Sequence, residues 1–194
     1  MDGNVDLLDD LSCGDDERAE EALAQLGVWG PELVEPLRER LDNPEPEVRW
    51  WAVRALAEIN DERVPGLLVK ALADPDQGVS WCAGLALRNH PATEAIPSLL
   101  VHLSDVDALT RRLAGDALVA IGSQAVPALL DVLQTGVHPA RLEAVRALAR
   151  IGDERAIPVL FAALDDGSAL IEYWANEGLE RMGVGMVFYR PGAS

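Results

Sequence analysis

The side chains best suited to acid–base catalysis or metal binding are few in this chain and stand far apart. Its three histidines occur in the short sequences NHP, VHL and VHP, as His90, His102 and His138. None of them belongs to a helical metal-binding motif such as HExxH. The two cysteines, Cys13 and Cys82, match no zinc or redox spacing and are predicted to be reduced thiols. The sequence therefore assigns no catalytic residue and no metal ligand.

Motifs for nucleophilic catalysis, phosphate binding and calcium binding are also missing from the sequence. It contains no GxSxG elbow and no glycine-rich phosphate loop. The acidic sequence DPD at residues 74–76 is not followed by a 12-residue calcium loop that ends in glutamate. We therefore expect the acidic clusters to form solvated turns, and Asp15 or Asp16 to cap the helix that follows.

The strong negative charge restricts the partners of the protein. The net charge is −17, from 33 acidic against 16 basic residues. Binding to nucleic acid or to an anionic membrane needs a basic surface, so neither is expected. A partner protein with a basic patch is compatible with this charge. The sequence also has no run of 18 apolar residues, and its N-terminus is acidic where a signal peptide is basic, which predicts a cytoplasmic protein.

Self-similar segments recur through most of the chain. Aligning VRWWAVRALAEI, residues 48–59, with later segments places an alanine, and four residues behind it a leucine, in register every 30 or 31 residues. Residues four apart share one helical face, so each pair marks the inward face of a helix. The pairs at this spacing are Ala52 and Leu56, Ala83 and Leu87, Ala114 and Leu118, Ala144 and Leu148, and Ala175 and Leu179. The earlier sequence RAEEALAQL gives a matching unit with Ala19 and Leu23.

A second helix is predicted after an apolar residue and a proline, in VPGLLVKAL, IPSLLVHL, VPALLDVL and IPVLFAAL. Proline in the first turn loses no hydrogen bond, because that backbone position has no partner within the helix. Turn-rich connectors separate the helices, and no segment shows β alternation. Helix pairs of this length bury their apolar faces only by stacking on neighbouring pairs. The sequence therefore predicts an all-α solenoid of about six helix pairs.

The repeats resemble the short bacterial HEAT-like repeats that are named after phycobilisome lyases. The segments VRWWAVRALAEINDERVPGLLVKALADPD and ARLEAVRALARIGDERAIPVLFAALDD carry this resemblance. It implies a right-handed α-solenoid, also called an alpha-alpha superhelix, of HEAT-like pairs. Deoxyhypusine hydroxylases have a similar architecture and bind iron through His-Glu pairs, but no histidine here is followed by glutamate.

Three segments are expected along the chain. Residues 1–17 form an acidic capping segment, residues 18–182 the repeat array, and residues 183–194 a C-terminal cap or tail. In the first segment, Val5, Leu8 and Leu11 provide an apolar face that can shield the first repeat. In the last segment, the apolar run at residues 186–189 can fold over the last helix pair.

Two adjacent tryptophans within the repeats suggest a binding surface. Neighbouring residues on a helix point about 100° apart, so Trp50 faces away from the inward side while Trp51 lies at its flank. We expect Trp51 to pack against a neighbouring repeat. The outward position of successive repeats holds Trp50, Trp81, Arg112, Leu142 and Tyr173. This row is either ordinary packing under the preceding loop or a partner-binding strip, since exposed aromatic strips mark interaction sites.

The second helices offer an alternative binding row on the opposite face. Lys70 and His102 lie there, and the presumed concave face would present both to a partner. His90 falls where other repeats have isoleucine, near the last turn of a helix, so we expect it to cap free carbonyl groups.

Three functions remain open, and the first is the leading prediction. The first is a non-catalytic scaffold, adaptor or assembly chaperone that binds another protein and needs no cofactor. The second follows from the family resemblance: a bilin lyase subunit or phycobilisome-associated protein that handles an open-chain tetrapyrrole. A purely structural, regular repeat protein fits less well, because the connectors are unequal and NHPATEA is irregular.

Overall fold

The structure is a computed structural model that describes residues 7–11 and 13–184, and those residues form helices and turns without a β-strand. The all-α prediction is therefore confirmed. The chain divides into unit 1, which ends at Leu99, and unit 2, which begins at Leu100. No helix in the described ranges is both long and apolar enough to cross a membrane.

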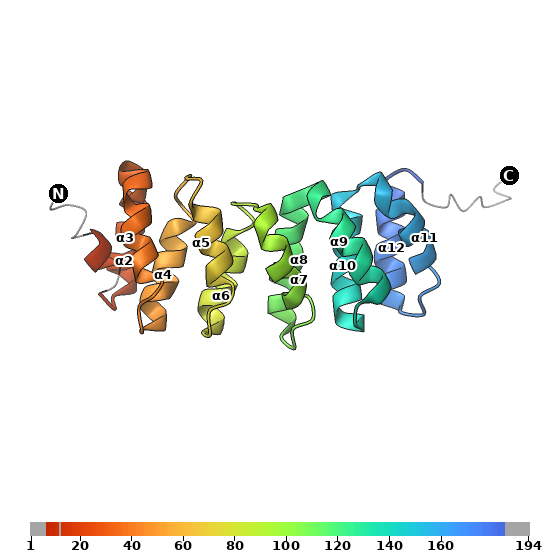
Figure 1. Cartoon of the computed structure of the whole chain (residues 1–194), viewed down its shortest axis with the longest axis horizontal. Helices are drawn as coiled ribbons and strands as arrows, with labels where there is room; N and C mark the ends of the chain where they lie inside the picture. The colour runs from red at the N-terminus through yellow and green to blue at the C-terminus, as the bar shows by residue number, and fades with distance from the viewer. Residues whose placement is uncertain (1–6, 12, 185–194) are drawn as a thin grey trace, which may run out of the picture. The chain divides into compact units, whose positions relative to one another are not determined.

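Unit 1 alternates first and second helices of the repeat (Figure 1). Its first helices are α2 (Asp16–Trp29), α4 (Pro46–Leu56) and α6 (Gln77–Ala86). Its second helices are α3 (Val34–Arg40) and α5 (Val64–Ala71), with the 3-10 helices η1 (Gly30–Leu33) and η2 (Thr93–Ala95) as connectors. The helix α7 (Ile96–His102) contains the boundary between the units. Within unit 1, α4 packs against α3, α5 and α6.

Unit 2 continues the same alternation. Its first helices are α8 (Ala108–Ile121), α10 (His138–Ile151) and α12 (Ala169–Arg181). Its second helices are α9 (Val126–Thr135) and α11 (Ile157–Ala163), preceded by η3 (Gly122–Gln124) and η4 (Glu154–Ala156). The helix α10 packs against α8, α9 and α12. Through residue 184 the described chain thus holds five helix pairs, followed by α12 as the first helix of a sixth unit.

The alanine–leucine pairs form the core as predicted. All six alanines are at most 3% exposed, and all six leucines at most 7%. Alanine at this position lets neighbouring helices approach closely, and α10 and α12 also come close together at Gly178. A Cβ atom added at Gly178 would lie only 2.9 Å from the Cα atom of Ala149. The small side chains therefore determine the distance between stacked first helices.

Two connectors are of identical type, and each of them joins one repeat to the repeat before it. In each, an aspartate accepts hydrogen bonds from the arginine two residues later, and that arginine donates to a carbonyl of the preceding repeat. The sets are Arg63 with Asp61 and the Pro31 carbonyl, and Arg155 with Asp153 and the Ser123 carbonyl. The arginine Nη2 to carbonyl distances are 2.9 Å and 2.6 Å. These side-chain hydrogen bonds lower the pKa of both aspartates to about 2.

A buried ion pair closes the turn between α5 and α6. Arg49 donates to both carboxylate oxygens of Asp74 at 2.7 and 2.8 Å and to the carbonyls of Asn43 and Pro44 at 2.9 and 3.0 Å. Both charged side chains are at most 10% exposed. The hydrogen bond lowers the pKa of Asp74 and raises that of Arg49. The expectation of a solvated DPD turn is therefore wrong at Asp74, because the carboxylate neutralises an arginine on α4, the first helix of the same repeat.

The ends of the array are partly described. Leu7, Leu8 and Leu11 are buried, and Asp15 caps α2 by accepting from the backbone N–H groups of Glu17 and Arg18. Val5 and the apolar run at residues 186–189 lie outside the described residues, so the predicted segment boundaries at 17 and 183 stay predictions.

We predict that Arg49→Ala destabilises the protein by about 3 kcal/mol, because it leaves the buried Asp74 carboxylate without its partner. The matched control is Lys70→Ala, which removes the exposed ion pair between Lys70 and Asp42 and should change stability by less than about 0.5 kcal/mol. Urea unfolding followed by circular dichroism measures both. Equal effects of the two substitutions would show that the Arg49 pair contributes no more than a surface pair.

The connector aspartates predict a loss of stability in acid. Their folded pKa lies below the ordinary value of 3.8, so the stability they contribute is present above that value. It is lost as the pH falls from about 4 towards about 2. The difference in urea midpoint between the wild type and an Asp61→Asn, Asp153→Asn variant should therefore shrink over this range. A difference that stays constant with pH would contradict the prediction.

Candidate functional site

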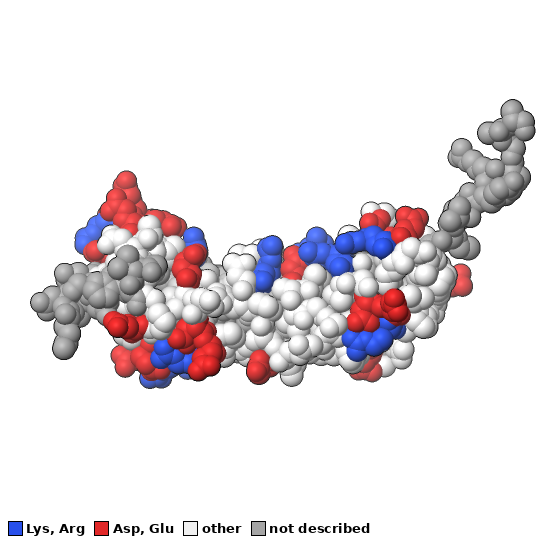
Figure 2. Space-filling model, turned by 90° about the horizontal axis from the view of Figure 1, so that it is seen from above, with Lys and Arg blue, Asp and Glu red and all other residues white. Residues whose placement is uncertain are grey.

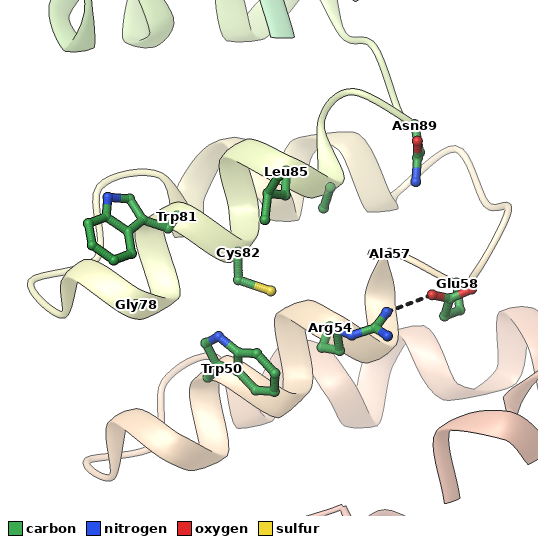
Figure 3. Close-up of a pocket in the computed structure, with 10 residues that line it drawn as sticks. Trp50, Arg54, Ala57, Glu58, Gly78, Trp81, Cys82, Leu85 and Asn89 are labelled. Atoms are coloured by element: carbon green, nitrogen blue, oxygen red, sulfur yellow. Dashed lines mark hydrogen bonds and ion pairs between the residues drawn. The ribbon is translucent and has the colours of Figure 1, made fainter. Parts of the chain in front are cut away.

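A hollow of about 370 Å³ opens between α4 and α6 in unit 1 (Figure 3). Small-molecule sites range from about 300 to 1,000 Å³, so the hollow suits a small ligand or part of a larger one. The side chains that define it come equally from the two helices and the turns that follow them. They are Trp50, Arg54 and Glu58 on one side, and Trp81, Cys82 and Leu85 on the other.

The two adjacent tryptophans have different surroundings. Trp51 is 5% exposed, which confirms that it is a packing residue, whereas Trp50 is only half-buried and lines the hollow. The two rings meet edge to face, with centroids 4.8 Å apart and an interplanar angle of 88°. This arrangement is favourable for aromatic pairs. The buried ring of Trp51 thus supports the ring of Trp50 at the edge of the hollow.

Trp81 and Leu85, both on α6, form the side of the hollow opposite to α4. Trp81 is half-buried, like Trp50 one repeat earlier, and Leu85 is 49% exposed. At the start of α6, Gly78 faces Trp50, and a Cβ atom added there would lie 3.9 Å from Cδ1 of that ring. The hollow therefore has apolar walls on which a flat molecule can pack.

The thiol of Cys82 points from α6 into the space between α6 and α4 in Figure 3, and the residue is 7% exposed. Burial raises its pKa to about 11, although the positive charge of Arg54 acts in the opposite direction. The thiol is therefore neutral near pH 7, and a neutral thiol is a weak nucleophile. The hollow is suited to non-covalent binding rather than to capture of a ligand by Cys82.

An ion pair forms the polar end of the hollow. Arg54 lies one helical turn after Trp50 and donates to the carboxylate of Glu58 at 2.8 Å. The arginine and glutamate side chains are 36% and 51% exposed, so this pair is a weak surface interaction. Figure 3 shows the indole rings at one end of the hollow and this pair at the other.

The corresponding space between α8 and α10 in unit 2 is filled by charged side chains. Arg146 occupies on α10 the repeat position that Leu85 occupies on α6, and it is 1% exposed. It donates to Glu143 at 2.7 Å and to Asp116 at 3.0 Å. A Cβ atom added at Gly115 would lie 2.8 Å from Nη2 of Arg146, so the guanidinium group packs directly against this glycine. Repeats of the same pattern thus either fill this space or leave it open.

The predicted row of outward residues is only partly brought together. Trp50 and Trp81 share the hollow of unit 1, while the other three lie in unit 2. There, Arg112 is exposed and pairs with Asp116 at 3.8 Å, and Leu142 is half-buried. Tyr173 is 57% exposed and contacts Trp174 edge to face, with ring centroids 5.3 Å apart.

Neither residue of the alternative row on the second helices lines the hollow. Lys70, on α5, is exposed and donates to Asp42 at 2.8 Å. His102, the last residue of α7, is half-buried and belongs to unit 2. His90 has its Nε2 atom 2.8 Å from the carbonyl oxygen of Ala57 at the end of α4. The expected contact with a carbonyl is thus present, but the carbonyl belongs to the preceding repeat.

Of the six side chains that define the hollow, sequence reasoning missed four, namely Arg54, Glu58, Cys82 and Leu85. The available signal was the four-residue spacing from Trp50 to Arg54 and from Trp81 to Leu85, which places each pair on one helical face. No group of three histidine, cysteine, aspartate or glutamate side chains in residues 7–11 and 13–184 is arranged to hold a metal ion. The hollow is therefore the candidate site with the most developed geometry.

The negative charge is unevenly distributed along the chain. Unit 1 carries 21 acidic against 8 basic residues, whereas unit 2 carries 12 against 8. Figure 2 shows acidic side chains gathered over the N-terminal helices of unit 1. A basic partner surface would accordingly be attracted mainly to unit 1.

Comparison with known proteins shows which family this chain resembles. The family model for HEAT repeats matches residues 4–88, 64–141 and 96–180. The uncharacterized phycocyanin operon protein Z of Pseudanabaena tenuis is 30% identical over 158 residues, which are 74% of this chain and 78% of that protein. This chain is a HEAT-repeat protein of the phycobilisome-lyase type.

One further relative agrees with this assignment, and a solved structure shows the same fold. The phycocyanobilin lyase subunit beta of Nostoc sp. is 37% identical over 111 residues, which are 56% of this chain. This HEAT-repeat chain thus matches about half of that subunit, 54% of its length. The crystal structure of the complex of CpcE and CpcF of phycocyanin lyase from Nostoc sp. contains a chain with a TM-score of 0.56 and 21% identity, covering 91% of this chain and 76% of that one. This likeness confirms the α-solenoid fold.

The comparisons correct the first of the three functions expected from the sequence. A non-catalytic scaffold or assembly chaperone was the leading prediction, but the related proteins are named for phycocyanobilin lyase and for bilin biosynthesis. The prediction failed because it relied on the lack of short catalytic motifs. A repeat array assembles its site from positions about 31 residues apart, which no short motif records.

We predict that Cys82 resists alkylation in the folded protein, because its thiol is buried and neutral. Native protein treated with iodoacetamide near pH 8 should carry the label on the exposed Cys13 alone, and denatured protein should carry it on both cysteines. Peptide mass spectrometry distinguishes these products. Rapid labelling of Cys82 in the native state would show that its thiol is accessible from the hollow and reactive.

Proposed function

We propose that this HEAT-repeat chain handles an open-chain tetrapyrrole, a bilin, as a subunit of a bilin lyase or of a related phycobilisome-associated protein. The observation that carries the proposal is the hollow between α4 and α6, with a tryptophan on each side, in a chain related to phycocyanobilin lyase subunit beta. The bilin is a substrate or cargo in this proposal, and the hollow contacts part of it.

The chemistry of the hollow supports a flat, conjugated ligand. Trp50 and Trp81 provide large rigid surfaces, and aromatic rings gain about 0.5–1.5 kcal/mol per pair beyond the burial of area. The neutral thiol of Cys82 leaves the pigment unmodified, so a bilin would remain free to pass on to another protein. The volume of about 370 Å³ accommodates one part of the tetrapyrrole and leaves the remainder exposed.

A protein partner belongs to the same proposal. The related protein from Nostoc is named as a subunit, and a solved relative is a complex of two chains. The acidic surface of unit 1 favours a partner with a basic patch. In this proposal the two proteins meet in the cytoplasm. In unit 2, Arg112, Leu142 and Tyr173 remain candidates for contact with such a partner, as do Lys70 and His102 at the other row.

The proposal predicts that the purified protein binds phycocyanobilin. Binding should quench tryptophan fluorescence and induce circular dichroism in the visible absorption band of the pigment. The double substitution Trp50→Ala, Trp81→Ala should weaken binding by about tenfold or more, since it removes both aromatic walls. Far-ultraviolet circular dichroism should stay unchanged, because both rings are only half-buried.

The matched control is Phe161→Ala on α11, which removes an aromatic ring that is 41% exposed and lies outside the hollow. It should bind the pigment like the wild type. Failure of the wild-type protein to bind phycocyanobilin, alone and with a lyase-type partner subunit, would overturn the proposed function.

A further inference from the structure

We infer that Arg54 makes the hollow selective for a ligand that carries a carboxylate group. The flat part of the ligand packs on Trp50 and Trp81, and an acidic side arm reaches Arg54 at the polar end. The identity of this ligand as a bilin, which bears two propionate groups on a conjugated ring system, rests on the proposed function. The selectivity itself rests on the geometry of the hollow.

The hollow separates apolar side chains from charged ones. Arg54 is the one cationic side chain among the residues that line the hollow. It lies four residues after Trp50 and therefore on the same face of α4. Because Figure 3 places the indole rings and the guanidinium group at opposite ends, the hollow matches a molecule that is apolar along its body and anionic at one end.

Arg54 can exchange its hydrogen-bond partner, Glu58, for a carboxylate of the ligand. Its hydrogen bond to Glu58 joins two residues four apart on the surface, where 36% and 51% of the side chains are exposed. Such pairs contribute little to stability, because both charges remain hydrated. A ligand carboxylate held by the hollow can therefore replace Glu58 at the guanidinium group, forming a charge-assisted and potentially bidentate pair.

Unit 2 provides an internal comparison for this argument. Arg146 also lies between two first helices, but it is 1% exposed and already binds both Glu143 and Asp116. A carboxylate from outside could reach the buried Arg146 guanidinium only by displacing two half-buried carboxylates, Glu143 and Asp116. Arg54, with a single exposed partner and open space beside it, is free of this restriction.

The experiment compares phycocyanobilin with its dimethyl ester, which has the same conjugated system without the negative charges. Wild-type protein should bind the diacid about fivefold to tenfold more tightly than the diester. Arg54→Gln should abolish this preference and leave ester binding unchanged. Arg54→Lys, which keeps the charge but loses the planar fork, should retain part of it. Glu58→Gln is the matched control and should retain or increase the preference, because it removes the competing carboxylate.

A second pair of probes separates this inference from the proposed function. The compounds 1-pyrenebutyrate and its neutral amide share a flat apolar body and differ in the carboxylate. If phycocyanobilin does not bind but pyrenebutyrate is preferred over the amide through Arg54, the proposed function is wrong and the inference stands. If phycocyanobilin binds and depends on Trp50 and Trp81, but Arg54→Gln changes acid and ester equally, the inference is overturned. If the protein binds neither phycocyanobilin nor pyrenebutyrate, the inference about Arg54 is overturned as well.

Discussion

The structure depends on one constraint: a helix pair of about 31 residues cannot bury its apolar faces unless it stacks on a neighbouring pair. The alanine and leucine of each first helix meet this constraint, and all twelve of these side chains are almost fully buried. The short alanine side chain brings the helices together, and the leucine fills the space one turn later. Polar contacts then fix the register between repeats. Arg63 reaches the Pro31 carbonyl, and His90 reaches the Ala57 carbonyl, each about one repeat back along the chain.

Once the inward face is fixed, the remaining positions of each first helix are free to vary. This freedom explains why equivalent places in the two units have opposite character. Between α8 and α10 a buried arginine, Arg146, fills the space and binds two carboxylates. Between α4 and α6 the same place holds Leu85 and stays open. The change from a filled to an open space needs only a few substitutions and leaves the alanine–leucine core untouched, so a binding site can arise in one repeat without destabilising the array.

The difference between fixed inward positions and variable remaining positions also explains which features of the structure the sequence predicts. The helix pairs, the inward positions and the packing role of Trp51 were predictable, because they repeat with a fixed period and depend on local helix geometry. The buried pair between Arg49 and Asp74 was not, since its partners are 25 residues apart and the DPD sequence looks like a solvated turn. The hollow itself was not predicted, although two of its residues, Trp50 and Trp81, were named as candidate contacts in an outward row. The positions of Cys82, Arg54 and Glu58 around the hollow are set by how closely α4 and α6 approach each other. That distance is a result of tertiary packing and not of the sequence period.

The combination of an open aromatic hollow and a neutral thiol also limits the chemistry of unit 1. A reactive cysteine needs an exposed and electropositive environment. Cys82 has the charge of Arg54 nearby, but its burial outweighs that charge and raises its pKa to about 11. A pigment in the hollow would therefore be held by ring packing and by charge, both of which are reversible. Reversible binding is what a carrier or a lyase subunit requires, because the pigment must leave the hollow to reach the protein that finally holds it.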